Sequence, residues 1–312
     1  MEKKIVLVAC GTGIATSTVV NDAVTKLAKL NNIPVEIIQC KMMEVPSYAD
    51  RANLLITTTV ADKSKYNFPV INARAFLTGI GLDKTKEEIL AAARSFENVA
   101  LDVVEWRVDW FEGVFDFEKV EDVLKELRAV LGETPILMTF RTSKEGGEKS
   151  IEPEDYAKLN IKAAQTGYVD FIDVEIFTGD AIVTKIIDGA HAAGVKVIAS
   201  NHDFHKTPEK SDIIYRLRKM QDMNADIPKI AVMPQNKKDV LTLLSATEEM
   251  TSLYADRPII TMSMAGTGVI SRLCGEVFGS SMTFGAAKKA SAPGQMGVKE
   301  LETILGLLHS AM

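Results

Sequence analysis

A lysine lies in the middle of an apolar stretch, D-I-P-K-I-A-V-M-P, at residues 226–234. The β-branched residues and flanking prolines of this stretch are typical of a buried strand. Lys229 would lose its hydration there, and that loss is costly unless the ammonium group is paired or becomes neutral. A neutral amine can attack a carbonyl carbon and form a Schiff base. The alternative is an edge strand whose lysine points to water and opposes aggregation.

Further polar side chains recur near the ends of four neighbouring strand-like runs: Glu105, Arg107, Thr139, Arg141, Asp173, Glu175 and His202. A core ion pair or a solvated strand end accounts for one such residue, but not for the same pattern in five strands. In α/β barrels, the inward and C-terminal positions of the strands are where catalytic groups gather. The pattern therefore favours a catalytic role for Lys229.

These residue types suit imine chemistry. Burial and the two nearby arginines are expected to lower the pKa of Lys229, so that its amine can attack a ketone. The iminium then acidifies the adjacent C–H bond, whose proton needs a general base. His202 is the best-placed base, with His205 as the alternative, and Glu145 can orient its imidazole ring.

Composition narrows the class of protein. The chain has 312 residues, of which 46% are hydrophobic and 25% charged, as in ordinary globular proteins. A net charge of −6 gives no electrostatic case for binding nucleic acid or anionic membranes, and no apolar run is long enough to span a bilayer. The three cysteines, Cys10, Cys40 and Cys274, have no metal-ligand spacing, and we expect a reducing cytoplasm and no metal site.

Strand-like and helix-like runs alternate along the whole chain, which predicts an α/β protein with parallel sheets. Residues 1–83 form a first group, with strands at 4–9, 34–40, 53–59 and 68–73 and a helix from about Ala15 to Leu30. This pattern suits a small doubly wound parallel sheet.

The second group, residues 84–312, has eight helix patterns, beginning near Lys84, Asp116, Glu152, Gly179, Pro208, Asn236, Gly268 and Gly297. Seven strand patterns lie between them, at 99–107, 135–141, 171–177, 195–202, 228–233, 258–264 and 281–286. This alternation predicts a (β/α)8 TIM barrel whose first strand is atypical. The only candidate for that strand is A-F-L-T-G-I-G, residues 75–81, whose two glycines make a poor strand.

Six stretches of the second group resemble type I 3-dehydroquinate dehydratase. They are E-W-R-V-D, T-F-R-T-S-K-E-G-G-E, S-N-H-D-F-H-K-T-P, D-I-P-K-I-A-V-M-P, I-I-T-M-S-M-A-G-T-G-V-I-S-R and K-K-A-S-A-P-G-Q, in the order of that family. The resemblance covers about residues 84–312. It implies a cytoplasmic lyase that converts 3-dehydroquinate to 3-dehydroshikimate and water through a lysine Schiff base. It also implies the shikimate pathway of aromatic amino acid biosynthesis and no cofactor, and we expect a homodimer.

The resemblance assigns roles to individual residues. Lys229 is implied to form the imine, His202 to transfer the proton and Glu145 to support it. The substrate-binding residues that it implies are Glu105, Arg107 and Arg141 near the hydroxyl groups, Arg272 on the carboxylate, Ser291 and Gln295 in a closing loop, and Met262 and Phe284 as apolar walls. The sequence departs from the family at the N-terminal end, where neither its initial hairpin nor a clear first strand is recognisable.

Cys10 lies in A-C-G-T-G-I-A-T-S-T, where a strand turns into a helix and backbone N–H groups favour an anion. Such a position lowers the pKa of a thiol and suits a covalently held phosphate. Residues 1–82 resemble the galactitol-type enzyme IIB component of the bacterial sugar phosphotransferase system, on K-K-I-V-L-V-A-C-G-T-G-I-A-T-S-T-V-V, N-I-P-V-E-I-I-Q-C-K and F-P-V-I-N-A-R-A-F-L-T-G-I-G. The resemblance implies a phosphocysteine at Cys10 and IIA and IIC partner components.

We expect a fusion of an enzyme IIB-like domain, residues 1–82, with a dehydroquinase barrel, residues 83–312. Residues 70–97 are shared between the two predicted domains. The helix K-T-K-E-E-I-L-A-A-A-R-S-F in this segment would have to complete both domains, although it has a single apolar stripe. Either the barrel takes this segment, or it stays incomplete and recruits a neighbouring chain. Alternatives to the dehydratase are a phosphocarrier acting through Cys10 and a barrel that only senses metabolites.

Overall fold

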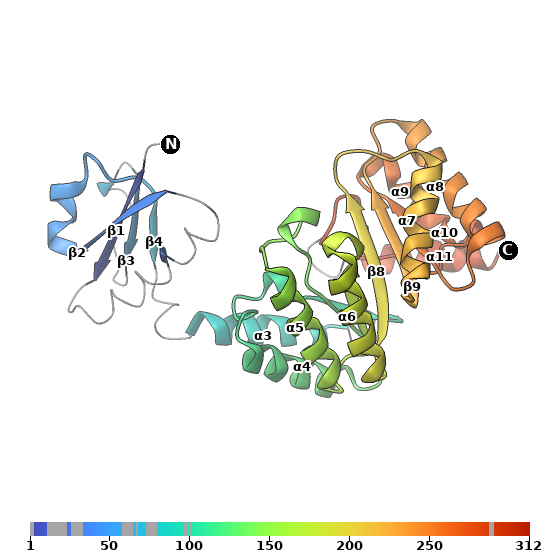
Figure 1. The fold of residues 1–312 in the computed structure, drawn as a ribbon, viewed down its shortest axis with the longest axis horizontal. Helices are drawn as coiled ribbons and strands as arrows, with labels where there is room; N and C mark the ends of the chain where they lie inside the picture. Colours follow the sequence, from blue (N-terminus) through green and yellow to red (C-terminus); the bar gives the residue numbers. More distant parts are fainter. Residues whose placement is uncertain are drawn as a thin grey trace. The chain divides into compact units, whose positions relative to one another are not determined.

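The computed structural model describes residues 3–10, 24–25, 34–57, 65–66, 68–72, 80–96, 99, 101–286 and 290–312. The chain divides into two compact units, Met1–Thr85 and Lys86–Met312 (Figure 1). In the part of the chain that is described, no helix is both long and apolar enough to cross a membrane.

The first unit is built on a four-stranded parallel sheet in the order β2-β1-β3-β4. The strands are β1 (Lys4–Cys10), β2 (Val35–Lys41), β3 (Leu54–Thr57) and β4 (Val70–Asn72), each where the sequence predicts one. Successive residues of β1 enter different apolar clusters, Val6 and Val8 in one and Leu7 and Ala9 in the other. Both faces of β1 are therefore covered, as is usual for parallel sheets.

Cys10 is the last residue of β1, the strand between β2 and β3. The chain leaves β1 toward one side and later returns to its other side, and this reversal is where open α/β sheets bind ligands. The Cys10 side chain and residues 11–23 lie outside the described residues. Of the helix expected from Ala15 to Leu30, only Val24 and Thr25 are described, and both are helical.

The second unit has a parallel sheet of six strands in chain order (Figure 1). They are β5 (Val104–Arg107), β6 (Ile136–Thr139), β7 (Phe171–Glu175), β8 (Lys196–Asp203), β9 (Ile227–Val232) and β10 (Ile260–Ser263). All but the first residue of β7 and all of β6, β9 and β10 are buried, because side chains fill the inside of the curved sheet and helices cover its outside. This is the arrangement of a TIM-barrel-like α/β fold.

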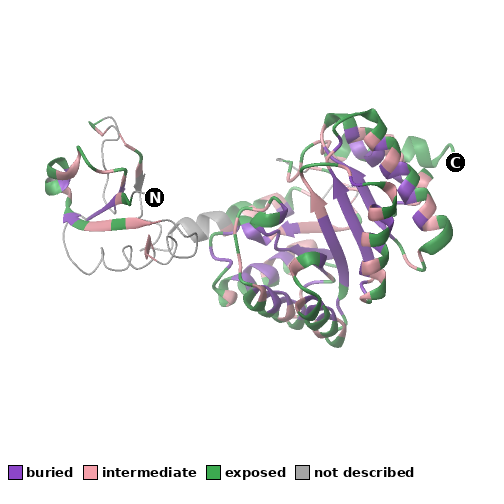
Figure 2. Ribbon diagram, turned by 45° about the horizontal axis from the view of Figure 1, so that its top comes forward, coloured by how far each residue is buried: buried purple, intermediate pink, exposed green. Residues whose placement is uncertain are grey.

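Helices follow the strands and pack on the outer face of the sheet, burying one side and exposing the other (Figure 2). They are α3 (Ile80–Arg94), α4 (Phe117–Leu131), α5 (Pro153–Gln165), α6 (Asp180–Ala192), α7 (Lys210–Asp222), α8 (Lys237–Glu249), α9 (Val269–Leu273), α10 (Gly275–Phe278) and α11 (Val298–His309). Asn236 caps α8, since its side chain accepts hydrogen bonds from the backbone N–H groups of Lys238 and Asp239.

The strand predicted at 281–286 is wrong. Residues 281–285 have no regular structure, and only single parallel bridges flank them, Ile259 with Ser280 and Ala286 with Gly297. Helix α11 packs closely against this segment, because a Cβ added to Gly285 would lie 3.0 Å from the Cα of Val298. The segment therefore follows the surface of the helix instead of pairing with β10 along its length.

The candidate first barrel strand, residues 75–81, is not seen as a strand. Ile80 and Gly81 already belong to α3, and residues 75–79 lie outside the described residues. The described side chains of α3 belong with the second unit, because Lys86 forms ion pairs with Asp122 and Glu126 of α4. Leu90 and Ala93 are buried on the same helical face as Lys86, so this part of the apolar stripe serves the second unit.

Candidate active site

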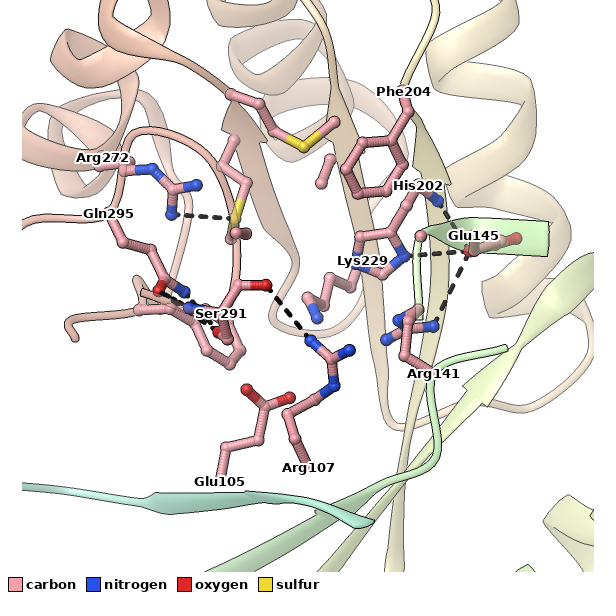
Figure 3. Close-up of a pocket in the computed structure, with 16 residues that line it drawn as sticks. Glu105, Arg107, Arg141, Glu145, His202, Phe204, Lys229, Arg272, Ser291 and Gln295 are labelled. Atoms are coloured by element: carbon pink, nitrogen blue, oxygen red, sulfur yellow. Dashed lines mark hydrogen bonds and ion pairs between the residues drawn. The ribbon is translucent and has the colours of Figure 1, made fainter. Parts of the chain in front are cut away.

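The C-terminal ends of the strands in the second unit surround a pocket (Figure 3). It is lined by Glu105, Arg107, Arg141, Glu145, Gly146, His202, Phe204, Lys229, Ala231, Met262, Met264, Arg272, Phe284, Ser291, Ala292 and Gln295. All eleven barrel residues predicted to be catalytic or to bind substrate, from five strands and the segments after them, are brought together here.

Lys229 lies in the middle of β9 with 4% of its surface exposed, and its ammonium group faces the pocket. Nζ is 3.5 Å from Oδ2 of Asp173 and 4.6 Å from the centre of the Phe284 ring. Burial lowers the pKa of Lys229; Asp173 opposes this shift, and Arg141 adds to it. The net lowering makes the neutral, nucleophilic amine more accessible than it is on a solvated lysine.

Asp173 does not act as a free counter-ion for Lys229. Its Oδ1 accepts hydrogen bonds from Arg141 at 2.8 Å and from the Ser200 hydroxyl at 2.7 Å. Burial alone would raise the pKa of Asp173, but Arg141 and Lys229 outweigh it, so the pKa is lowered. Arg141 also donates to Glu175 at 3.0 Å, so its charge is largely compensated within the barrel. The sequence placed Asp173 among the polar residues near the strand ends but gave it no role.

His202, near the end of β8, is held by Glu145. Oε2 of Glu145 lies 3.0 Å from Nδ1 of His202 and accepts the His202 backbone N–H at 2.8 Å (Figure 3). Burial, then the cations Arg141 and Lys229, lower the pKa of His202 well below its usual value. At neutral pH the ring is therefore neutral, which is the form that can accept a proton.

A tight turn presents Glu145 to His202. Gly146 has φ +83°, a conformation that L side chains rarely adopt, and the Gly147 N–H donates to the Thr142 carbonyl at 2.8 Å. A Cβ on Gly147 would lie 1.9 Å from the Arg141 carbonyl oxygen. The two glycines of T-S-K-E-G-G-E are thus required by the geometry of the turn.

Glu105 and Arg107 come from β5 and lie on one side of the pocket (Figure 3). Arg107 makes a bidentate ion pair with the fully buried Asp109, at 2.8 Å from both Nε and Nη2, and its Nη1 donates to the Ser291 carbonyl at 3.3 Å. Glu105 accepts a hydrogen bond from the Thr139 hydroxyl at 2.8 Å. Both side chains are therefore oriented before any ligand arrives.

Arg272 lies in α9 with 2% of its surface exposed, and none of the described carboxylates pairs with it. Its Nη2 reaches the Pro293 carbonyl at 3.4 Å and Nη1 lies 3.3 Å from the Met262 sulfur, while Nε has no described partner. Burial lowers the pKa of Arg272 to about 10. A buried cation without a counter-ion is a ready site for an anion.

The segment after residue 290 closes part of the pocket. Ser291 and Gln295, which line the pocket, are hydrogen-bonded to each other. The Gln295 side chain accepts from the Ser291 backbone N–H at 2.7 Å and donates to the Ser291 hydroxyl at 2.9 Å. Gly294 has φ +79°, and a Cβ there would lie 2.4 Å from the Ala265 carbonyl oxygen. The glycine of S-A-P-G-Q thus lets this loop approach the end of β10.

Some predictions fall away from the pocket. His205, the alternative base, is exposed and is not among the lining residues. Five lining residues were not predicted as site residues, although all lie in the stretches that carry the family resemblance: Gly146, Phe204, Ala231, Met264 and Ala292. Among the described residues, no group of three or more histidine, cysteine or acidic side chains could hold a metal ion.

Comparisons with known proteins agree with this division of the chain. The family model described as type I 3-dehydroquinase matches residues 82–312, and that of the PTS system lactose/cellobiose-specific IIB subunit matches residues 5–88. The two matches overlap at residues 82–88, inside α3. The IIB match carries a lactose/cellobiose description where the sequence suggested the galactitol type.

Individual relatives cover the second unit. The 3-dehydroquinate dehydratase of Clostridioides difficile strain 630 is 55% identical over 231 residues, 74% of this chain and 91% of the relative. That of Escherichia coli strain SE11 is 58% identical over 228 residues, 73% and 89%.

Solved structures give the same result. The type I 3-dehydroquinate dehydratase of Clostridium difficile with covalently modified comenic acid has a TM-score of 0.71 at 56% identity, covering 73% of this chain and 89% of that chain. The enzyme of Enterococcus faecalis has a TM-score of 0.67 at 44% identity, covering 71% and 89%. With its inner-strand lysine and paired histidine and glutamate, the chain belongs to the type I 3-dehydroquinase family and carries a IIB-type segment ahead of that domain.

Proposed function

We propose that the second unit is a 3-dehydroquinate dehydratase, a hydro-lyase that forms 3-dehydroshikimate and water through an imine on Lys229. The observation that carries this proposal is the buried Lys229 amine, whose pKa is lowered at the base of the pocket. The names of the relatives and the family match support the reaction. The reaction would serve the shikimate pathway, as the family resemblance implies.

The covalent step begins with the neutral Lys229 amine. Its Nζ attacks the ketone carbon, and loss of the carbonyl oxygen as water leaves a protonated imine. The Phe284 ring, whose centre is 4.6 Å from Nζ, can stabilise this cation by a cation–π interaction. Because the iminium accepts electrons, the proton on the neighbouring carbon can be removed at neutral pH.

His202 is the base in this proposal. With Glu145 accepting at Nδ1, the other ring nitrogen has a free lone pair for the substrate proton. The resulting imidazolium, stabilised by Glu145, then returns a proton to the departing hydroxyl group, which leaves as water. Hydrolysis of the product imine consumes one water and frees Lys229, so the net change is the loss of one water.

The remaining pocket residues bind the substrate. We propose that Arg272 takes the carboxylate, since it is a buried cation without a described counter-ion. Glu105 and Arg107 lie where they could bind hydroxyl groups, and Ser291 and Gln295 cover the bound molecule. Met262 and Phe284 would form its apolar walls. Arg141 differs, because Glu175, Ser200 and Asp173 already accept three of its five donors, and in this proposal its main effect is electrostatic.

Trapping with borohydride tests the imine. Wild-type protein, incubated with 3-dehydroquinate and sodium borohydride, should gain a reduced adduct on the peptide that contains Lys229. Lys229→Ala should give no adduct and no enone absorbance, whereas Lys196→Ala, which removes an exposed lysine at the start of β8, should behave as wild type. Normal turnover by Lys229→Ala would overturn the proposal.

For the first unit we propose a phosphocarrier role, with Cys10 as the phosphorylated residue and IIA and IIC components as partners. The position of Cys10 at the end of the central strand and the IIB family match support it. Incubation with the general phosphotransferase proteins and labelled phosphoenolpyruvate should label wild-type protein but not Cys10→Ser. Label retained by Cys10→Ser would contradict the assignment.

We further propose a domain boundary at residues 82 and 83, a homodimeric cytoplasmic protein without a bound cofactor, and no nucleic-acid partner. The net charge of −6 supports the last point. Light scattering after size-exclusion chromatography measures the mass directly, and a monomer at micromolar concentration would contradict the dimer.

A further inference from the structure

A chain of hydrogen bonds leads from helix α7, outside the barrel, to the His202–Glu145 pair. Nη1 of Arg216 donates to Oδ1 of Asn201 at 2.9 Å, and Nδ2 of Asn201 donates to Oε1 of Glu145 at 3.1 Å. Both residues are largely shielded from solvent: 16% of the Arg216 side chain is exposed, and Asn201 is 6% exposed. Neither residue lines the pocket.

The direction of this chain is set by Arg216. A guanidinium group can only donate, so the Asn201 amide must turn its oxygen toward Arg216 and its NH2 group toward Glu145. Asp212 holds Arg216 in place with a bidentate pair, Nε to Oδ1 at 3.2 Å and Nη2 to Oδ2 at 2.7 Å. This leaves Nη1 for Asn201, with Asp203 3.6 Å away.

Because Asn201 presents an NH2 group, Oε1 of Glu145 must accept. The other oxygen, Oε2, already accepts the His202 backbone N–H at 2.8 Å. Donors at both oxygens favour the ionised form of Glu145, which can only accept from the His202 ring at Nδ1. With Glu145 ionised, a neutral His202 ring carries its proton on Nδ1 and keeps Nε2 unprotonated, which is the tautomer that can act as a base.

We propose that Arg216 and Asn201 are positioning residues that hold Glu145 in its accepting form and thereby select the base-competent tautomer of His202. The inference deepens the proposed dehydratase function and rests on it for its kinetic consequence. Without these donors, a protonated Glu145 could donate to Nδ1, and His202 would carry its proton on the wrong nitrogen.

The charged groups around Glu145 and His202 determine the pH range in which Glu145 ionises. Burial raises the pKa of Glu145 to about 7, against the opposing effect of Arg141 and with the help of Glu175. The groups that act on His202 are Arg141, Lys229 and Arg107, all cationic, besides its bond to Glu145. Glu145 thus ionises close to neutral pH, where the loss of one donor changes its charge state most.

Three variants and one control test the proposal. Arg216→Met removes the donor and Arg216→Lys restores a cation that can donate to Asn201; Asn201→Leu removes the link itself. Arg218→Met is the matched control, because Arg218 lies two residues away on α7 and stacks on Tyr254 instead. Thermal unfolding of each variant shows whether it is folded.

For Arg216→Met and Asn201→Leu we expect the acidic limb of the kcat profile to move up by about one pH unit. Asn201→Leu removes the donor to the carboxylate, and Arg216→Met leaves the Asn201 amide free to turn its oxygen toward Glu145. At pH 7 that shift lowers kcat about fivefold, since ionised Glu145 falls from about a half to about a tenth. Near pH 9 kcat should approach the wild-type value, and KM should change little. Arg216→Lys should lie between Arg216→Met and wild type. An equal loss of kcat at every pH would mean a merely structural role and would overturn the proposal, as would an unchanged profile.

Nitrogen-15 NMR of the histidine side chains gives a readout that does not need turnover. The His202 signals, assigned by their loss in His202→Gln, should report the Nδ1–H tautomer in wild type at pH 8 and a gain of the Nε2–H form in Arg216→Met. The same tautomer in both proteins would overturn the inference. Absence of dehydratase activity in wild type, with the tautomer shift present, would instead count against the proposed function alone.

Discussion

The buried carboxyl group of Glu145 makes stability depend on pH in a way that can be measured. Burial raises its pKa from 4.5 to about 7 in the folded protein, so the folded state favours the neutral form. The stability that depends on this neutral form is fully present below the unfolded pKa and is lost as pH rises through the folded value. In Glu145→Gln, a neutral side chain of the same shape replaces it, and this loss disappears.

The magnitude follows from the shift. A rise from 4.5 to about 7 corresponds to about 3 kcal/mol between pH 4 and pH 8. The free energy of unfolding of Glu145→Gln, measured relative to wild type, should therefore increase by about 3 kcal/mol over that range. At pH 4 the variant should be the less stable protein, because its NH2 group must face a donor of Asn201 or His202.

Urea unfolding followed by tryptophan fluorescence suits this measurement. Both tryptophans, Trp106 and Trp110, belong to the second unit, so the signal reports the domain that contains Glu145. Glu154→Gln is the matched control, since the Glu154 side chain is 62% exposed and pairs with Lys185 at the surface. A stability difference between Glu145→Gln and wild type that is the same at both pH values, or that falls with pH, would refute the reasoning.

Three further predictions concern binding, the turn and the relation of the two units. Arg272→Met should raise KM for the carboxylated substrate about tenfold or more, because a charge-assisted hydrogen bond is lost; steady-state kinetics with unchanged KM would speak against Arg272 as the carboxylate ligand. Gly147→Ala places a Cβ 1.9 Å from the Arg141 carbonyl, so it should lower both the melting temperature and kcat, and a variant with wild-type values would show that the turn can relax. Cys10→Ser should leave dehydration unchanged in the enone assay; a large drop would mean that the two units are coupled.

Sequence reasoning found most of the site because its signals were local. Polar side chains at the ends of strand-like runs mark a barrel mouth, and the glycines after Glu145 mark a tight turn. All eleven predicted barrel residues line one pocket, and helices α4, α5, α6 and α8 begin at or directly after the residues predicted to start them. Their roles in the reaction stay predictions until the variants are made.

Other features depended on contacts between distant segments. The run 281–286 has the composition of a strand, but contact with α11 leaves it without a ladder. Asp173 was visible as an inner residue, yet its sharing among Arg141, Ser200 and Lys229 needed coordinates. The sequence favoured His202 over His205 as the base, and the structure supports that order, because His202 pairs with Glu145 in the pocket whereas His205 is exposed outside it.

The amino-acid sequence alone indicated the class of fold, most of the strands and helices, and a lysine within a buried strand, because hydrophobic periodicity and a charged residue in an apolar strand are local properties. The tertiary structure decided which charges compensate one another. The pKa of Lys229 reflects burial opposed by a shared Asp173, and the state of His202 reflects Glu145 held by Asn201 and Arg216. Electrostatic energies depend on the distances between charged groups and on their burial in the folded protein, and neither can be read from the amino-acid sequence.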